Sequence, residues 1–504
     1  MQMKKLFFTL FVIICVSNYT FSQTVSIDEN FGENGIVTNP NYGVELLTFD
    51  GQGNIFALGY ASFGFPAVLK TNANGIIDQH FGTNGMVILN EYGSNWGKRY
   101  GIKITNDNKI VIVFLVYTHG AVGPSDPPKF LIMRFNHDGS VDKSFGINGE
   151  ITLGHSVDAV NTENDDFMLI VHGHAYYDDN GYNQDTYVSK YNYNGELDES
   201  FGVNGRAYLT GNQMRKFGVE SIKILKDQSI IVAGYDSSLS LSTKLAFCKL
   251  NPNGSFVANF ANNGIFSGDI NINNNGDPKS LINIIEDGDE NLFFTGRHNE
   301  RDVSGNITRR YFICNFNANG TFNSNFGKNG IFYFSDVWSN SKETVLQSGN
   351  RFLIGKDRKI TSINSNGTLD TYFHDNGSFV FKDFSINDMK QQNSNELIVA
   401  GREGIVKLNI HNETSIKPNE ISSSLLIFPN PVKDELRIEW KIGGSHSGKM
   451  RINSVEIIDL SGKTIVNCKS TIVNQINVST LPKGIYFIKI KTDKNIVIKK
   501  FIKG

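Results

Sequence analysis

A five-residue string, Phe-Gly-x-Asn-Gly, recurs seven times and constrains this chain more than any other feature. The copies begin at Phe31, Phe81, Phe145, Phe201, Phe260, Phe326 and Phe373. The intervals between them are 50, 64, 56, 59, 66 and 47 residues, about 57 on average. Two copies replace the second residue, with Ala261 and His374. Self-similarity at such a period indicates one supersecondary unit whose copies bury a common core.

A second turn, Asn-x-Asn/Asp-Gly, precedes six of these strings. Its copies begin at Asn72, Asn136, Asn192, Asn251, Asn317 and Asn364. Three residues before the Phe there is an aspartate in five copies, namely Asp28, Asp78, Asp142, Asp198 and Asp370. Two residues before the Asn, four copies carry a cation: Lys70, Arg134, Lys190 and Lys249. We expect each aspartate to hold backbone N–H groups of its turn and to pair with the cation; calcium ligation is the alternative.

Four short apolar runs per unit, bounded by Asn, Asp and Gly, predict four strands. The third run ends in Gly, as at Gly59 and Gly401. The chain is therefore predicted to be all-β, a seven-bladed β-propeller of seven repeats over residues 23–410. The last unit, ending near Ile410, has no following Phe-Gly turn, so the N-terminal residues should supply its missing strand. An open β-solenoid is the alternative, but the unit is too long for one coil.

The repeats from Asp28 to about Ile410 resemble the delta-60 repeat family of bacterial extracellular proteins. The resemblance rests on the two turns and the aspartate between them, with Ala261 and His374 as departures. Because that family is defined by its repeat, it implies an architecture and no chemistry.

The composition agrees with a chain full of tight turns. There are 59 Asn and 49 Gly against 11 Pro, and Asn and Gly tolerate the positive φ of such turns. The net charge of −2 excludes a generally basic nucleic-acid binder.

The first 22 residues have the pattern of a signal peptide. Lys4 and Lys5 precede an apolar run, and small residues end at Ser22. The run is too short to span a bilayer, and no later stretch is long enough. We therefore expect cleavage after Ser22, export, and no transmembrane segment.

Residues 411–424 read as a linker, and residues 425–504 as a small Ig-like β-sandwich. The latter segment resembles the type A sorting domain of the type IX secretion system of Bacteroidota. The residues that carry the resemblance are Pro429, Asn430, Pro431, Asp459, Gly462, Lys463, Gly484, Tyr486, Lys499 and Lys500. The resemblance implies two partners, the secretion machinery and its sortase-like processing enzyme. It also implies release outside the cell or attachment to its surface.

The charge is divided between these parts. Residues 425–504 carry 14 Lys and Arg against 6 Asp and Glu, a net +8, whereas residues 23–424 carry 32 against 44, a net −12. The part expected to remain after processing is an acidic propeller.

The candidate ligand site is the residue that follows the Gly of each third run. These residues are Tyr60, His174, Tyr235, Arg297, Lys356 and Arg402, with Leu115 in an irregular copy. Equivalent positions of a propeller form a ring, and these side chains suit sugars or anionic groups. The alternative is that they are unconstrained, solvated loop starts.

No pattern for catalysis, metal or cofactor binding stands out. His172 and His174 with Asp178 and Asp179 lack a third ligand at a fixed spacing, and no hydrolase or nucleotide-binding motif is present. We expect no metal and no cofactor, and we expect Cys248 and Cys314 to be apolar strand residues. The sequence favours a secreted glycan- or protein-binding module; an extracellular hydrolase or lyase acting on polysaccharide is the alternative.

Overall fold

The computed structural model describes residues 23–38, 42–90, 99–116, 129–153, 157–161, 166–178, 181–209, 217–236, 244–268, 278–301, 307–334, 343–412, 425–440, 452–459, 463–468, 475–492 and 496–504. The chain forms two compact units, Met1–Asn412 and Glu413–Gly504. The expected signal peptide lies outside the described residues, as do residues 413–424 of the expected linker.

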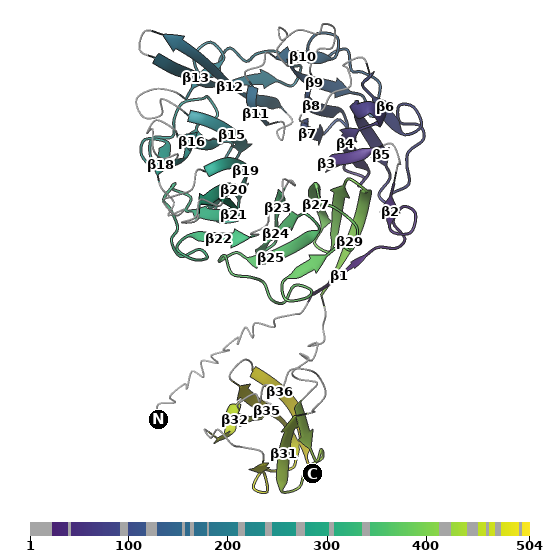
Figure 1. Ribbon diagram of the computed structural model, residues 1–504, viewed down its shortest axis with the longest axis vertical. Helices are drawn as coiled ribbons and strands as arrows, with labels where there is room; N and C mark the ends of the chain where they lie inside the picture. The colour runs from purple at the N-terminus through teal and green to yellow at the C-terminus, as the bar shows by residue number, and fades with distance from the viewer. Residues whose placement is uncertain are drawn as a thin grey trace, which may run out of the picture. The chain divides into compact units, whose positions relative to one another are not determined.

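Seven antiparallel sheets follow one another around an axis in the first unit (Figure 1). The first three sheets contain β3 (Gly43–Phe49), β4 (Ile55–Tyr60), β5 (Pro66–Thr71) and β6 (Met86–Ile88); β7 (Arg99–Ile104), β8 (Ile110–Val116), β9 (Lys129–Phe135) and β10 (Glu150–Leu153); and β11 (Val157–Asn161), β12 (Phe167–Asp178), β13 (Gly181–Asn192) and β14 (Arg206–Tyr208). The next three contain β15 (Phe217–Ile224), β16 (Ile230–Asp236), β17 (Lys244–Leu250) and β18 (Ile265–Gly268); β19 (Pro278–Glu286), β20 (Leu292–Arg301), β21 (Ile307–Phe316) and β22 (Ile331–Phe334); and β23 (Glu343–Ser348), β24 (Arg351–Lys356), β25 (Lys359–Asn364) and β26 (Ser378–Val380).

The seventh sheet is built from both ends of the propeller. It contains β27 (Asp388–Asn393), β28 (Glu396–Gly401) and β29 (Gly404–Asn412), and the outer edge of β29 pairs with β1 (Gln23–Ile27) and β2 (Ile36–Val37). The predicted seven-bladed propeller and its closure by the N-terminal residues are confirmed. The propeller runs two residues beyond the predicted boundary, because Gln23 pairs with Asn412.

Each boundary between neighbouring sheets holds a hydrophobic cluster with one repeat Phe in it. The seven Phe side chains are at most 3% exposed. Burying each one stabilises the fold by roughly 1.5–3 kcal/mol. The repeat therefore supplies one Phe to each boundary.

A backbone hydrogen bond joins neighbouring sheets beside each Phe. In six of the seven copies, the residue after Phe donates its N–H to the third residue of the next sheet's Asn-x-Asn/Asp-Gly turn, as from Gly82 to Asp138 at 2.9 Å and from Gly202 to Asn253 at 2.8 Å. The residue after Phe has positive φ in all seven copies, including Ala261 at 46° and His374 at 44°. The two departures from Gly therefore keep the turn conformation of the other five.

The second unit is a small β-sandwich of two sheets. One contains β30 (Leu425–Phe428), β31 (Glu435–Trp440) and β34 (Gln475–Asn477), and the other contains β33 (Thr464–Cys468), β32 (Ile452–Ile458), β35 (Gly484–Thr492) and β36 (Ile496–Lys503). A single hydrophobic cluster lies between them, with Leu436, Ile457, Ile488 and Phe501 fully buried.

Candidate functional site

The strand order divides the connections of the propeller between two faces. Because every sheet is antiparallel and follows chain order, its first and third connections lie at one end and its second connection at the other. The link to the next sheet also leaves from that other end. Both repeated turns occupy the third connection, so they all fall on one face, here called the turn face. The opposite face, here called the loop face, carries the connections that differ most between sheets.

On the turn face, the expected pairs of aspartate and cation are present. Lys70 lies 2.9 Å from Asp78, Arg134 lies 2.7 Å from Asp142 and Lys190 lies 3.3 Å from Asp198. The fifth sheet replaces the ion pair with a neutral one, because Asn323 donates to Asn315 at 2.6 Å. Lys249 faces Val257 instead of an aspartate and pairs with Asp227 at 3.0 Å.

The pairing between Lys407 and Asp28 was missed from the sequence. Lys407 Nζ lies 3.7 Å from Asp28 and 3.0 Å from Glu396, and the Asp28 N–H donates to the Lys407 carbonyl at 2.9 Å. The equivalent backbone bond joins Asp78 to Lys70. Lys407 lies two residues before Asn409, as the cations of the other copies lie two residues before their Asn. This spacing could have revealed the pairing of Lys407 with Asp28.

Asp142 shows what the turn does to its carboxylate. Burial acts to raise its pKa, but hydrogen bonds from the hydroxyl and amide of Ser144 and the charge of Arg134 outweigh burial and lower the pKa to about 2. Its oxygens therefore serve the turn and the ion pair. Among the described residues, no group of three or more His, Cys, Asp or Glu is placed to hold a metal ion.

The loop face contains the predicted ring, and the strand register corrects its membership. The register is measured by the pairing between the second and third strands of each sheet. In the first, fourth, fifth and seventh sheets, the residue three positions before the Gly of the second strand pairs with the residue two positions before the Asn of the third strand. Phe56 thus pairs with Lys70, and Ile231 pairs with Lys249. In the third sheet, Leu169 makes the equivalent pair with Lys190. Counting on from Leu169, His172 is equivalent to the Gly of the other sheets, and Gly173 is equivalent to the ring residue that follows it.

The sixth sheet is shifted in the opposite direction. Leu353 pairs with Ser362, so Lys356 takes the Gly position and Asp357 the ring position. The equivalent residues are therefore Tyr60, Leu115, Gly173, Tyr235, Arg297, Asp357 and Arg402. His174 and Lys356 each lie one strand position away from the ring that the Gly pattern predicted.

A close backbone approach explains the Gly in three of the regular sheets. A Cβ at Gly59 would lie 1.9 Å from the Gly43 carbonyl oxygen, and a Cβ at Gly234 would lie 1.9 Å from that of Gly218. The first strand is bulged beside these glycines, with extra residues Glu45 and Glu220. In the sixth sheet no such bulge is present, and Gly355 instead faces Met389.

The predicted ring side chains differ in exposure. Arg402 is exposed, Tyr60 and Arg297 are half-buried, and Tyr235 and Lys356 are buried. The side chain of His174 lies outside the described residues, although its backbone belongs to β12. They therefore do not form one uniformly exposed ring.

Tyr235 and Arg297 are neighbouring members of the corrected ring. Tyr235 is 7% exposed, and its hydroxyl has no hydrogen-bond partner among the described residues. Burial and the charge of Glu220 raise its pKa well above the usual range, and the charge of Arg297 opposes them. The hydroxyl is therefore protonated at neutral pH.

Lys356 of the sixth sheet lies over an aromatic ring of the fifth sheet. Its Nζ lies 3.8 Å from the ring centroid of Tyr311, and Tyr311 is the cross-strand partner of Arg297. Lys356 thus lies over the cross-strand neighbour of Arg297 at the boundary of the fifth and sixth sheets.

His172 is a buried residue whose ring contacts Ser189 and Tyr187. It is 9% exposed, its Nε2 lies 2.8 Å from the Ser189 hydroxyl, and it stacks on Tyr187 at 4.7 Å. Burial, with repulsion from Arg206, lowers its pKa to about 4. It is therefore neutral at physiological pH.

Cys248 and Cys314 are buried, free thiols. They belong to different clusters, at the boundaries of the third and fourth and of the fourth and fifth sheets. Burial raises the pKa of Cys248 to about 12 and that of Cys314 further, so both behave as apolar strand residues.

A hollow of about 500 Å³ lies far from the ring, on the turn face of the seventh sheet. It is lined by Asn393, Asn395, Glu396, Asn409, Ile410 and His411. Here the third strand runs on to pair with β1 and lacks the Asn-x-Asn/Asp-Gly turn of the other six sheets.

In the second unit, several of the predicted sorting residues contact or belong to the last strand, β36. Asn430 accepts the Ile502 N–H at 2.9 Å, and the Tyr486 ring stacks on Phe501 at 5.7 Å. Gly484 pairs with Lys503, and Lys499 and Lys500 pair with Ile488 and Phe487. Asp459 accepts the Lys463 N–H at 3.0 Å, Pro429 and Pro431 flank Asn430, and Gly462 lies outside the described residues.

Comparison with known proteins assigns the second unit. Residues 426–504 match the family model described as the secretion system C-terminal sorting domain. No curated protein matches the chain significantly. No helix among the described residues is long and apolar enough to cross a membrane.

Three solved structures are similar to the chain at low identity. They are YCF48 from Cyanidioschyzon merolae (12% identity, 75% of this chain and 99% of that one, TM-score 0.41), the WD40 β-propeller domain of Doa1 (11%, 75% and 97%, 0.40), and the PQQ-bound aldose sugar dehydrogenase from Streptomyces coelicolor (10%, 77% and 98%, 0.38). The fold is assigned from the strand pairing of the chain itself. The protein is a secreted β-propeller with a C-terminal type IX secretion sorting domain, which directs it to the cell surface or the extracellular space.

Proposed function

We propose that the propeller is a binding module that presents its loop face to a glycan, or to a protein, outside the cell. The observation that carries the proposal is the division between the two faces. The turn face is built from the same two turns and the same hydrogen bonds in sheet after sheet, whereas the loop-face ring contains tyrosine, arginine, aspartate, leucine and glycine at one position. Binding residues are commonly found on variable connections held by a rigid scaffold.

The chemistry of the ring favours a glycan. Tyr60 is half-buried and offers part of an aromatic face, and Arg297 and Arg402 offer several N–H donors each, which are the groups that bind sugar rings, hydroxyls and acidic substituents. Tyr235 is buried and remains a proposed contributor. His174 and Lys356 lie one position from the ring and remain proposed contributors.

Three further proposals concern the identity and maturation of the chain. The repeats belong to the delta-60 family, the signal peptide is cleaved after Ser22, and the sorting residues from Pro429 to Lys500 direct export.

A polysaccharide array tests the binding proposal. The chain from Gln23 to Gly504 is applied to neutral and acidic glycans, with release of reducing ends measured in parallel. Binding without release is expected. Release would indicate the hydrolase or lyase alternative, and the absence of binding to any glycan, together with capture of a protein from the cell surface, would leave only the protein-binding form of the proposal.

A further inference from the structure

Asn-Gly bonds are chemically labile, and the repeats of this chain contain many of them. Seven end the Phe-Gly-x-Asn-Gly strings, and five more end the Asn-x-Asn-Gly turns. Asparagine is among the thermolabile residues. It reacts most readily before Gly, because no Cβ hinders the Gly nitrogen from approaching the Asn side chain.

The reaction is deamidation, and it needs only water. The Gly nitrogen loses its proton and forms a bond to Cγ of the preceding Asn. The bond from Cγ to the amide nitrogen breaks, ammonia leaves, and a five-membered succinimide ring closes. Water then opens the ring at either carbonyl and leaves aspartate or isoaspartate. The state of the Gly N–H therefore controls the first step.

The Asn residues of the seven strings share one local structure. Each has a φ between 50° and 56° and an exposed side chain, and each is followed by a buried Gly. Their side-chain amides make no hydrogen bond with any described residue. The seven are Asn34, Asn84, Asn148, Asn204, Asn263, Asn329 and Asn376. Exposure and backbone conformation therefore do not distinguish them.

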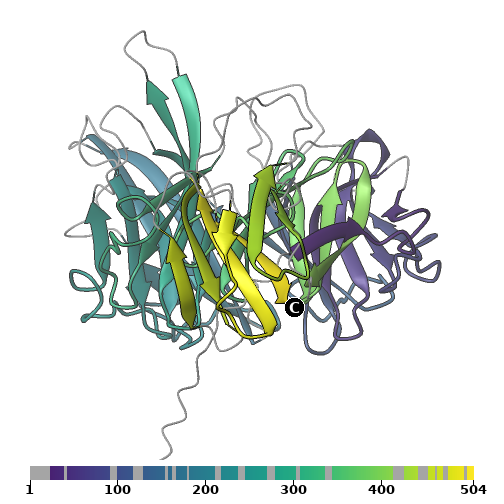
Figure 2. The same cartoon turned by 90° about the horizontal axis from the view of Figure 1, so that it is seen from below.

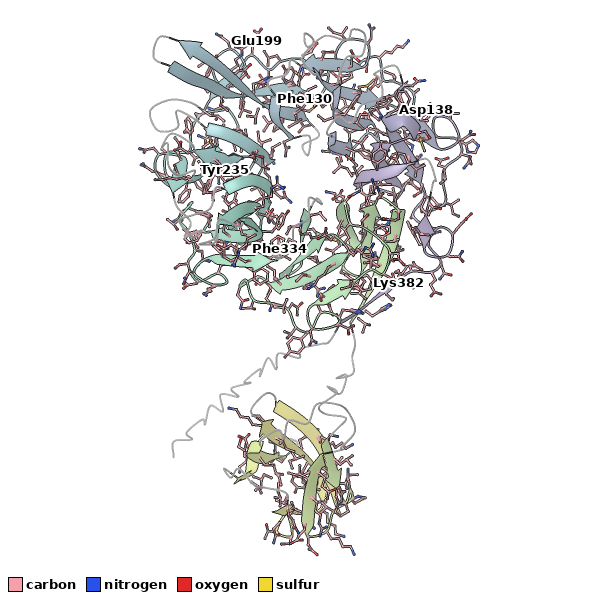
Figure 3. All side chains as sticks on the ribbon, viewed as in Figure 1. Phe130, Asp138, Glu199, Tyr235, Phe334 and Lys382 are labelled. Atoms are coloured by element: carbon pink, nitrogen blue, oxygen red, sulfur yellow. The ribbon has the colours of Figure 1, made fainter. Side chains whose placement is uncertain are left out.

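The seven strings differ at the Gly nitrogen. In four of them the Gly N–H is bonded. Gly149, Gly264 and Gly377 donate to the carbonyl of the Phe that begins the string, at 2.7–2.8 Å. Gly205 donates to the carbonyl of Glu199 at 3.1 Å, and Figure 3 shows Glu199 at the periphery of the propeller.

In the other three strings the Gly N–H is unbonded. The N–H groups of Gly35, Gly85 and Gly330 make no hydrogen bond with any described residue. Buried backbone N–H groups nearly always have a partner, so these three are exceptions within the repeat. Their nitrogens can attack Cγ without first giving up a hydrogen bond.

The Asn-x-Asn-Gly turns supply a second bonded group. In all five, the Gly N–H donates to the carbonyl of the first Asn at 2.8–3.0 Å. These glycines are Gly75, Gly195, Gly254, Gly320 and Gly367.

We propose that Asn34, Asn84 and Asn329 are sites of spontaneous deamidation in the folded protein. Each reaction replaces a neutral amide with a carboxylate, so the turn face gains one negative charge at each site. That face lies opposite the β20–β21 hairpin, which rises from the loop face in Figure 2. The inference is independent of the proposed binding function, because the reaction needs no ligand.

Peptide mapping by mass spectrometry tests the inference. The chain from Gln23 to Gly504 is incubated in mildly alkaline buffer, and the gain of one mass unit is followed in the peptide of each Asn-Gly bond. Methylation by an isoaspartyl methyltransferase identifies isoaspartate. We expect Asn34, Asn84 and Asn329 to react at least about threefold faster than the four bonded strings, since that is the net strength of a typical hydrogen bond.

Asn84→Gln is the matched control variant. Its longer side chain would have to close a six-membered ring, which forms more slowly, so the peptide of residue 84 should lose the mass change while that of Asn329 keeps it. Glutamine tolerates the conformation, because Gln228 has a φ of 66° in this same fold. The chain unfolded in urea is the second control, in which all seven strings should react at similar rates.

Three results would overturn the inference. Equal rates at all seven strings of the folded chain would mean that the Gly hydrogen bond has no influence. The same ranking in the folded and the unfolded chain would assign the difference to the flanking sequence and not to the fold. No mass change at Asn34, Asn84 or Asn329 of the folded chain, with reaction at all seven in urea, would mean that the turns protect every string.

Discussion

The carbonyl oxygen of Gln23 accepts the backbone N–H of His374 at 2.7 Å. In the other boundaries the same N–H is received by the third residue of an Asn-x-Asn/Asp-Gly turn, which the seventh sheet lacks. Gln23 therefore takes the place of the missing turn. The His374 side chain adds a bond of its own, because its Nδ1 accepts the Val25 N–H at 3.1 Å.

Removal of the closing segment should destabilise the whole propeller. A chain that begins at Tyr42 lacks the buried side chains of Val25, Phe31 and Val37, so we expect unfolding to become easier by about 5 kcal/mol or more, at roughly 1.5–3 kcal/mol for each side chain. Chemical denaturation measures the loss. A peptide of residues 23–37 added in trans should restore part of it, and a Val25→Asp peptide should not; equal rescue by both peptides would contradict the pairing.

Gly234→Ala should destabilise the fold because the new methyl group would lie 1.9 Å from the Gly218 carbonyl oxygen. We expect a loss of about 3 kcal/mol, since overpacking of a fixed backbone typically costs 1–3 kcal/mol and sometimes more. Gly51→Ala is the control, because its Cβ would meet nothing within 4 Å, and it should change the free energy of unfolding by less than about 0.5 kcal/mol. Similar losses in both variants would show that the close approach is absent.

Asp142 should contribute to stability at neutral pH and lose that contribution in acid. Its pKa falls from 3.8 to about 2 in the folded chain, which corresponds to roughly 2 kcal/mol. The contribution is complete above pH 3.8 and disappears as the pH falls toward 2. Asp142→Asn should therefore be less stable than the wild type at pH 7, with the difference shrinking by pH 2.

The exposed pair of Asp383 and Arg358, 3.7 Å apart, supplies a control for Asp142. Asp383→Asn should change the free energy of unfolding by less than about 1 kcal/mol at any pH. Urea titrations from pH 7 to pH 2 measure both variants, and an unchanged difference between wild type and Asp142→Asn across that range would refute the role of the ion pair.

His172 should make the fold sensitive to mild acid. Its pKa is about 4 when folded and 6.5 as a free side chain, so the unfolded chain takes up the proton first. Stability should fall by about 3 kcal/mol as the pH drops from 6.5 to 4, and level off below pH 4. His172→Gln should flatten this part of the pH profile, whereas His80→Gln, at a fully exposed side chain, should leave it unchanged. A thermal melt at each pH value makes the comparison.

Asn430→Ala should loosen the end of the sorting domain. It leaves the Ile502 N–H without its acceptor, at a cost of about 1–3 kcal/mol. We expect less protein at the cell surface and more in the periplasm, measured by protease accessibility on whole cells. Asn477→Ala, which removes the acceptor for Ser479 in another turn, is the comparison: an equal loss of display would mean that stability alone limits export.

Most of the propeller could be predicted from the repeat because its residues act locally. The Phe at each boundary, the positive-φ turns and the pairing of Lys70 with Asp78 each follow from a short stretch of sequence. The closure by the N-terminal strand was predictable as well, since the last repeat visibly lacks one strand.

The ring register could not be predicted because it depends on which residues pair across strands. The Gly at position 355 sits at the end of an apolar run, as Gly234 does, but for a different reason: it packs against Met389, and no bulge lies beside it.

The closed ring also imposes an order in time. A chain is made from its N-terminus, so Gln23 to Ile27 are among the first residues of the propeller to be synthesised, and their partners from Leu408 to Asn412 are the last. The seventh sheet can be completed only after β29 has been synthesised, because β1 pairs with it. Residue 412 directly precedes the second unit, so the propeller can close only shortly before the sorting domain is synthesised.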